Sequence, residues 1–311
     1  MISIKRILCP IDLASNTDQA LAYALALSQA HDAKLILLYC SQAEGVSAAA
    51  MGISSSMGST QVSLAMTVAQ MKASLGNAIA RVLGPQLGPQ FNWEAVVVEG
   101  GDPGECITQA AGDLGVDLIV MRSRRRPHRA AVLGSTAEAV CRTAPCPVFV
   151  THADEREWLE SSDGNITIER LLVAYDFSDY AELALGYGLS LAQEHQAELH
   201  LLHVLPPGSV SEPEIAWHSE VKETAYHQAA RRLQRMIPPE VYLWCQIKHA
   251  VSEGQPYREI LNYAEKNAID LISLGAHGAN FGMRTLFGSN VDRVLRQAPC
   301  PVLVARPRKP A

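Results

Sequence analysis

Residues 6–40 read "RILCPIDLASNTDQALAYALALSQAHDAKLILLYC", and a closely similar segment returns 164 residues later. There residues 170–204 read "RLLVAYDFSDYAELALGYGLSLAQEHQAELHLLHV", align without a gap, and are identical at 14 of the 35 positions. The motif "APCPV" occurs near the end of each half, at 144–148 and again at 298–302. The chain therefore contains two copies of one domain.

The segment between the copies, "HADEREWLESSDGNIT" at 152–167, is polar, acidic and rich in turn-forming residues. This composition is typical of a linker, so we expect a first domain over 1–151 and a second over 168–311. The first copy is longer because of residues 41–61, whose small side chains without periodicity indicate a mobile loop. The methionines of that loop offer an alternative, in which it covers a partner or a ligand.

Each copy alternates two kinds of hydrophobic pattern. Short apolar runs rich in branched residues, such as "KRILCPI" and "RLLVAYD", are typical of strands buried on both faces. Helices are expected near 16–32, 62–83, 103–115, 179–195, 214–236 and 256–268. Alternation of strands and helices predicts a doubly wound α/β fold in each copy, with a parallel sheet and helices on both faces. Ligands in such open sheets bind at the carboxyl ends of strands.

Composition narrows the function classes. The 311 residues carry a formal net charge of −6, so the chain lacks the overall basic field of a nucleic-acid-binding protein. No apolar run approaches the roughly 18 residues of a membrane span, and the first residues do not resemble a signal peptide. Seven cysteines without CxxC spacing indicate reduced thiols. We therefore expect a cytoplasmic protein with neither a membrane nor a nucleic acid as partner.

A glycine-rich loop, "GAHGANFGMRTLFGSN" at 275–290, connects the fourth strand of the second copy to a helix. Glycine lets a backbone approach a ligand closely or adopt positive φ, and a helix start offers free N–H groups and a favourable dipole to an anion. With the Ser289 hydroxyl as a further donor, the loop predicts a phosphate cradle. It is not a Walker A loop, since G-x4-G-K-[ST] is absent, and it is not the short G-x-G-x-x-G fingerprint.

The spacing G-x2-G-x9-G-[ST] resembles that of the universal stress protein family. So do "DFS" at 176–178 after the first strand, "LHLLHV" at 199–204 and "EGQP" at 253–256 before the third helix. The resemblance covers nearly the whole chain twice, although only the second copy has the full glycine pattern. It implies five parallel strands per copy in the order 3-2-1-4-5, fifth strands that pair across a two-fold axis within the chain, and binding of ATP, with or without Mg²⁺.

The resemblance assigns roles only to matching positions. Asp176 matches the family aspartate beside the adenine and ribose, the alternative being a helix cap or turn residue. Val204 matches a position whose backbone meets the adenine edge, the alternative being plain strand core. The phosphate and ribose loop matches Gly275, Gly278, Gly288 and Ser289, the alternative being a turn and a helix cap. His277 either touches a phosphate or is a solvated loop histidine, and Asn290 adds a donor at the helix start.

The first copy departs from this pattern. It keeps Asp12 and Ser135, but Arg122 falls about where Gly275 falls, and the loop is one residue shorter. A basic cluster is formed by Arg122, Arg124, Arg125, Arg126 and Arg129. These guanidinium groups either hold phosphates or belong to a solvated or interface loop. Because arginine fills the space that glycine leaves open, we expect one nucleotide per chain, in the second copy.

The sequence shows no catalytic set. There is no G-x-S-x-G elbow and no HExxH or Cys/His metal spacing, and the apolar strand that carries His200 and His203 indicates core or cleft lining. The expectation is a nucleotide-responsive regulator of the stress response, with slow ATP hydrolysis at most. One alternative is a nucleotide-free scaffold that binds a protein partner or another small ligand through the same cleft. The other is an ATP-cleaving enzyme. A homodimer of whole chains is compatible with each.

Overall fold

The computed structural model describes residues 2–12, 18–41, 70, 73–77, 91–123, 133–152, 168–208, 218–278 and 288–307. Five features discussed above lie wholly or mostly outside these residues: the loop 41–61, the helix expected near 62–83, the arginines 124–129, the linker 152–167 and the glycine loop 275–290, of which 279–287 are not described. Of the helix expected near 62–83, residues 70 and 73–77 are described and are helical.

The two copies have matching series of elements. The first contains β1 (Arg6–Pro10), α1 (Asp18–Ala30), β2 (Lys34–Ser41), β3 (Trp93–Glu99), α3 (Pro103–Asp113), β4 (Leu118–Arg122), α4 (Ser135–Thr143) and β5 (Val148–Thr151). The second contains β6 (Arg170–Ala174), α5 (Asp179–His195), β7 (Glu198–Leu205), α6 (His218–Met236), the 3-10 helix η3 (Pro239–Leu243), β8 (Ile247–Glu253), α7 (Pro256–Lys266), β9 (Leu271–Gly275), α8 (Ser289–Gln297) and β10 (Val302–Ala305).

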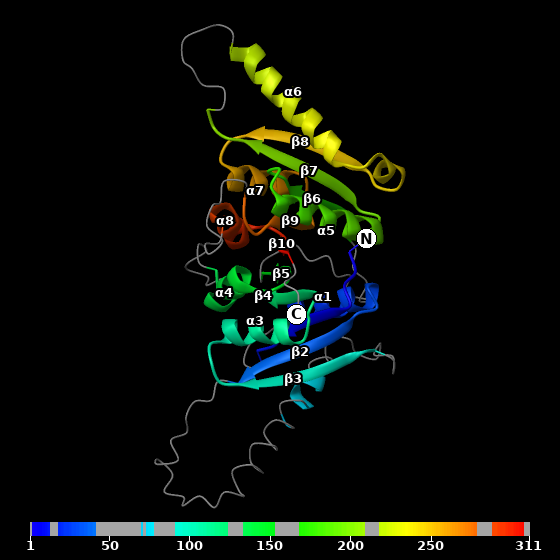
Figure 1. Cartoon of the computed structure of the whole chain (residues 1–311), viewed down its shortest axis with the longest axis vertical. Coiled ribbons are helices and arrows are strands. Elements are labelled where there is room, and N and C mark those ends of the chain that lie inside the picture. The colour runs from blue at the N-terminus through cyan, green and yellow to red at the C-terminus, as the bar shows by residue number, and fades with distance from the viewer. Residues whose placement is uncertain are drawn as a thin grey trace, which may run out of the picture.

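Within the described residues ten strands form one sheet, in the order β3-β2-β1-β4-β5-β10-β9-β6-β7-β8. The sheet runs the length of the molecule, with the first copy at one end and the second at the other (Figure 1). All pairings inside each copy are parallel, and each half of the sheet has the order 3-2-1-4-5. The α/β class with a parallel sheet and helices is confirmed.

The copies join through their fifth strands. β5 and β10 are antiparallel, with Phe149 opposite Leu303 at the centre of the pairing. Both side chains are buried. Antiparallel pairing of two equivalent strands relates the copies by a local two-fold axis and removes two exposed sheet edges. The predicted pairing of the fifth strands within one chain is therefore confirmed.

Helices cover both faces of the sheet and form two hydrophobic cores. Neighbouring strand residues point to opposite faces, so Leu35 and Leu37 join one core while Ile36 and Leu38 join the other. Helices α1, α5 and α6 contribute to the first core, and α3, α4, α7 and α8 to the second. Each core contains residues of both copies, which explains why both faces of the central strands are apolar.

Polar contacts also connect the copies. The His31 Nδ1 at the end of α1 lies 3.0 Å from a carboxylate oxygen of Glu194 at the end of α5. On the other face, the Arg306 Nη1 donates to the Cys141 carbonyl of α4 at 2.7 Å. Each contact joins residues more than 160 positions apart in the sequence, so the two copies fix one another's orientation.

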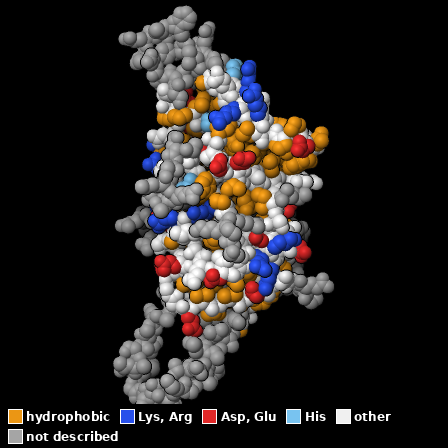
Figure 2. Space-filling model, viewed as in Figure 1, with side chains coloured by type: hydrophobic (Ala, Val, Ile, Leu, Met, Phe, Trp, Pro, Cys, Tyr) orange, Lys and Arg blue, Asp and Glu red, His pale blue; other side chains and the backbone are white. Residues whose placement is uncertain are grey.

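Within the part of the chain that the structure describes, no helix is long and apolar enough to cross a bilayer. On the face drawn in Figure 2, acidic and basic side chains are interspersed.

Candidate functional site

The candidate site lies where the carboxyl ends of β6, β7 and β9 approach the start of α8. β6 is central here, because it pairs with β7 on one side and with β9 on the other. The chain leaves β6 toward β7 and later returns to β9, so the strand order reverses at this point. A crevice at such a reversal is where open α/β sheets hold their ligands.

Asp176 follows β6 and is held by the turn that leads into α5. Its Oδ1 accepts hydrogen bonds from the Ser178 backbone N at 3.1 Å and from the Ser178 hydroxyl at 2.6 Å. The Ser178 oxygen in turn accepts from the Ala181 backbone N at 3.1 Å and caps α5. Ser178 is therefore the helix cap, and Asp176 fixes the cap in place with one of its two oxygens.

The other oxygen of Asp176 is directed at the glycine loop. A Cβ atom added to Gly278 would lie 2.8 Å from the Asp176 Oδ2, and Gly278 is otherwise exposed. The carboxylate that ends β6 and the backbone that follows β9 are therefore neighbours, as the sequence pattern predicts. Any side chain at position 278 would push between them.

The other two glycines are required for different contacts. At Gly275, an added Cβ would lie 2.6 Å from the Cβ of Tyr180 and 2.8 Å from its carbonyl oxygen, because α5 packs directly on the end of β9. Gly288 donates its N–H to the Ala276 carbonyl at 3.4 Å and thereby brings the two ends of the loop together. The backbone of Gly275, Gly278 and Gly288 lies outside the positive-φ region, so close approach explains these glycines.

The start of α8 presents backbone donors beside this loop. Gly288 is the N-cap and supplies no side-chain acceptor to the first N–H groups of the helix. Ser289 and Asn290, the first two helical residues, are exposed. The expectation of a solvated His277 is wrong: its side chain is buried, and its ring meets the Tyr180 ring edge-on at 5.0 Å.

Val204 lies one residue before the end of β7, opposite Ser252 of β8. Its side chain is half-buried and packs against the core beneath α7 and α8. The strand-core role is therefore observed, and its backbone still lies at the carboxyl end of the strand.

One residue of the site has a conformation that the sequence does not reveal. Phe177 has φ of 64°, a left-handed conformation that is rare for a bulky side chain. The Arg232 guanidinium carbon lies 3.7 Å from the centre of its ring and the tilted His203 ring lies 4.7 Å away, and these contacts hold the Phe177 side chain. In the sequence Phe177 is marked only by the "DFS" motif, and this motif does not predict a left-handed conformation.

The first copy keeps the helix start but changes the end of its fourth strand. Gly134 caps α4 with φ and ψ of −61° and 138°, close to the −60° and 130° of Gly288. Arg122 pairs with Thr151 as Gly275 pairs with Ala305, so arginine does occupy the place of the first glycine. At this place the copies therefore share the helix start and differ at the strand end.

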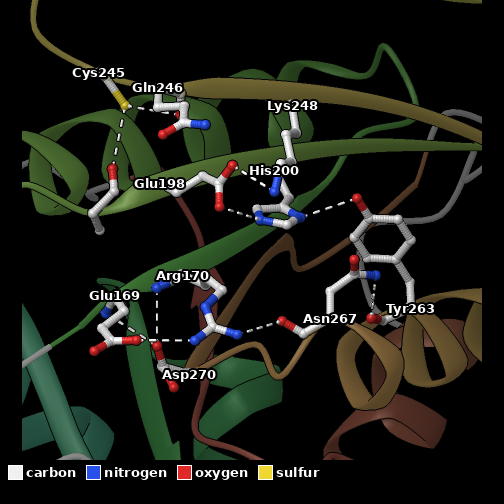
Figure 3. A network of polar contacts seen from close by, with 11 residues as sticks. Glu169, Arg170, Glu198, His200, Cys245, Gln246, Lys248, Tyr263, Asn267 and Asp270 are labelled. Carbon is white, nitrogen blue, oxygen red and sulfur yellow. Dashed lines mark hydrogen bonds and ion pairs between the residues drawn. The ribbon is translucent and has the colours of Figure 1, made fainter.

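A second group of polar residues lies at the opposite, amino ends of the same strands (Figure 3). The Asp270 Oδ2 accepts from the backbone N–H groups of Glu169 and Arg170 at 3.0 and 2.9 Å. In the first copy Asp117 accepts from two equivalent N–H groups. Because both copies have this contact, it serves the fold and not the glycine loop.

His200 is more deeply buried than Asp270, with 1 % of its surface exposed against 8 %. Its Nδ1 lies 3.0 Å from the Tyr263 hydroxyl and its Nε2 3.4 Å from Glu198, which also binds the Lys248 ammonium at 2.7 Å. Burial lowers the pKa of His200 and outweighs the nearby carboxylate. Burial raises the pKa of Glu198, but Lys248 and His200 more than compensate, so the pKa of Glu198 is also lowered.

These shifts predict that stability falls with acidification. Below pH 6.5 the unfolded chain protonates His200 before the folded chain does, so the folded state loses stability as pH falls; Glu198 continues the loss below its ordinary pKa. Denaturant titrations from pH 7.5 to 5 should show a shallower decline for His200→Gln, by at most about 1.4 kcal/mol per pH unit. The control is the exposed His227→Gln. Equal slopes in all three proteins would contradict the assignment.

Comparison with known proteins agrees with this architecture. The family model described as "Universal stress protein family" matches residues 3–152 and 167–306. Universal stress protein MJ0531 of Methanocaldococcus jannaschii is 30% identical over 152 residues, which are 47% of this chain and 87% of that protein. Universal stress protein Slr1230 of Synechocystis is 28% identical over 205 residues, 65% of this chain and 61% of that protein.

Among solved structures, a universal stress protein from Archaeoglobus fulgidus is similar over 99% of this chain and 100% of its own, with a TM-score of 0.66 and 21% identity. This similarity concerns the fold. The two matches to the family model together span most of the sequence, and they coincide with the internal repeat and the two halves of the sheet. The chain therefore belongs to the universal stress protein family and carries two copies of its domain in tandem.

Proposed function

We propose that the second copy binds an adenine nucleotide, ATP, and that the protein is a nucleotide-responsive regulator of the stress response. The observation that carries this proposal is the contact between the Asp176 Oδ2 and the backbone of Gly278 beside the start of α8. It places a carboxylate, a bare backbone and helix N–H groups at one strand-order reversal. The resemblance of the "DFS" and glycine patterns to the family supports adenine as the base.

Each group has a role that its chemistry suits. The N–H groups at the start of α8, with the Ser289 hydroxyl and the Asn290 amide, donate to phosphate oxygens. Asp176 accepts from a ribose hydroxyl, and the backbone beside Val204 meets the adenine edge. Gly275 and Gly288 shape the loop, and the buried His277 supports it from below. Mg²⁺, when bound, neutralises part of the triphosphate charge.

We assign the first copy to residues 1–151 and the second to 168–311, with 152–167 as the linker. The first copy serves as the built-in dimer partner, because its β5 covers the edge that β10 would otherwise expose. The protein acts in the cytoplasm, where binding of the nucleotide alters its affinity for a protein partner.

Hydrolysis of ATP is expected to be slow. Asp176, the carboxylate of the site, already accepts two hydrogen bonds from Ser178 and is positioned to bind rather than to activate water. Steady-state turnover should stay below about 1 s⁻¹, the low end of the ordinary enzyme range. Phosphate release at or above that rate, lost on Asp176→Asn, would favour an ATP-cleaving enzyme instead.

Paired substitutions of the equivalent aspartates test the proposed function. Asp176→Asn keeps an Oδ1 acceptor for Ser178, and hence the α5 cap, but removes the charge that faces Gly278. Calorimetry with MgATP should show affinity reduced by about 10- to 100-fold, the cost of one charge-assisted hydrogen bond. Asp12→Asn, the matched control in the first copy, should bind as the wild type does. Loss of binding in the Asp12 variant alone would refute the proposal.

A further inference from the structure

The first copy has two cysteines where the second copy has its cleft. Cys40 lies one residue before the end of β2, as Val204 does in β7. Cys106 is the fourth residue of α3, as Glu259 is of α7, and both helices begin with proline. Both thiols are free and only half-buried, whereas the other five cysteines of the chain are buried.

The backbone brings these two sulfur atoms together. Cys40 pairs with Val98 of β3, and Gly100 follows two residues later. The Cys106 Sγ donates to the Gly100 carbonyl at 2.9 Å, and α3 packs on β2. The Cys40 side chain packs against the second core, to which α3 contributes Ile107, so both thiols lie on the same face of the sheet. The dithiol formed by Cys40 and Cys106 therefore bridges the end of a strand and the first turn of a helix.

The second copy shows what the dithiol replaces. A Cβ on Gly254 would lie 3.0 Å from the Glu259 carboxylate, and a Cβ on Gly101 would lie 3.2 Å from the Cys106 Sγ. Glu259 and Cys106 thus fill equivalent places beside the turn that follows the third strand. A carboxylate and a valine in one copy correspond to two thiols in the other, so the chemistry of these equivalent positions differs.

We propose that Cys40 and Cys106 form a modification site, a dithiol that hydroperoxides oxidise to an intramolecular disulfide in the first copy. The oxidised bond would link the end of β2 to the first turn of α3.

The reaction balances with hydrogen peroxide as the oxidant. The Cys106 thiolate attacks one peroxide oxygen, the O–O bond breaks, and the departing hydroxide takes a proton to form water, leaving a sulfenic acid. The Cys40 sulfur then attacks the Cys106 sulfur; the S–S bond forms, the S–O bond breaks, and the hydroxide leaves as water with the Cys40 proton. Two thiols and one peroxide give one disulfide and two waters, so the sulfurs lose the two electrons that the peroxide gains.

The environment assigns the order of the two cysteines. Burial, followed by the charge and hydrogen bond of Cys106, raises the pKa of Cys40 to about 12. Cys40 therefore stays protonated until Cys106 has been oxidised, and its proton passes to the leaving hydroxide as the Cys40 sulfur attacks. Stabilising the thiolate favours the reduced form of a dithiol pair. The Cys40 thiolate is disfavoured, so the equilibrium of this pair shifts toward the disulfide.

Peptide mapping of the full-length protein tests this proposal. Reduced protein is treated with one equivalent of hydrogen peroxide, denatured in iodoacetamide and digested. The expected result is a peptide pair linked through Cys40 and Cys106, a fall in alkylated thiols from seven to five, and recovery of all seven with dithiothreitol. Cys40→Ser should accumulate a sulfenic acid at Cys106 that dimedone traps. The matched control is Cys245→Ser, which removes a buried cysteine and should retain the linkage.

Three outcomes would overturn the proposal: seven alkylated thiols after peroxide, a linkage that involves any other cysteine, or a sulfinic acid on Cys106 with Cys40 still reduced. The same treatment in denaturant shows whether the Cys40–Cys106 linkage depends on the folded structure, because the unfolded chain should give mixed linkages. No nucleotide enters the experiment, so its failure and the failure of nucleotide binding in the second copy are distinguishable.

Discussion

Gly278→Val is expected to lower the affinity of the protein for ATP by about 100-fold or more, roughly 2.7 kcal/mol, with the fold unchanged. A Cβ at this position would already lie 2.8 Å from the Asp176 Oδ2, and the branched carbons beyond it would fill the gap between carboxylate and loop. Gly278 is exposed, so the substitution disturbs no core. Calorimetry with MgATP measures the affinity, and circular dichroism with thermal melting measures the fold.

Gly112→Val is the matched control for this substitution. Gly112 lies in α3 of the first copy, and its added Cβ would meet nothing within 4 Å. ATP affinity of the control should equal that of the wild type. Unchanged affinity in Gly278→Val would show that the glycine loop does not hold the nucleotide.

Gly275→Ala is expected to destabilise the second copy by about 3 kcal/mol, the upper end of the usual cost of overpacking. The new methyl would lie 2.6 Å from the Tyr180 Cβ and 2.7 Å from its backbone carbonyl carbon. Neither the strand nor the helix can move away easily, because β9 is paired with β6 and β10 and Tyr180 lies in the first turn of α5. The midpoint of urea unfolding should fall accordingly.

Gly186→Ala provides the comparison. Gly186 lies in α5, the helix that also contains Tyr180. Its added Cβ would make an ordinary contact, 3.6 Å from the Ile2 Cδ1. A helical alanine with room for its methyl is stabilising by up to about 1 kcal/mol. If Gly275→Ala unfolded at the same urea concentration as Gly186→Ala, the packing explanation of Gly275 would be incorrect.

The architecture could be predicted because it is encoded locally and twice. Apolar runs such as residues 6–10 and 170–174 are buried on both faces, and alternating helices leave few topologies for a parallel sheet. The resemblance to the family predicted that the fifth strands pair, and the identical "APCPV" motifs located these strands in both copies; the register, with Phe149 opposite Leu303, came from the structure. The neighbourhood of Asp176 and Gly278 followed likewise from strands that end at one edge.

The details of the site depend on tertiary contacts that no local pattern records. Three glycines in one loop appear equivalent in the sequence, yet Gly275 accommodates a helix, Gly278 a carboxylate and Gly288 a strand end. His277 is buried, and its ring meets Tyr180 of α5, which is distant in the sequence. Phe177 takes its left-handed conformation between side chains from α6 and β7. Each of these depends on residues distant in the sequence or on another element.

The number of bound nucleotides distinguishes the two copies, because the proposed site lies in the second copy alone. Native mass spectrometry of freshly purified protein, before and after addition of MgATP, counts the nucleotides bound to each chain. Occupancy should saturate at one nucleotide per chain, and the bound species should disappear in Gly278→Val but persist in Asp12→Asn. Two nucleotides per chain, or a single one that survives Gly278→Val and is lost in Asp12→Asn, would contradict it.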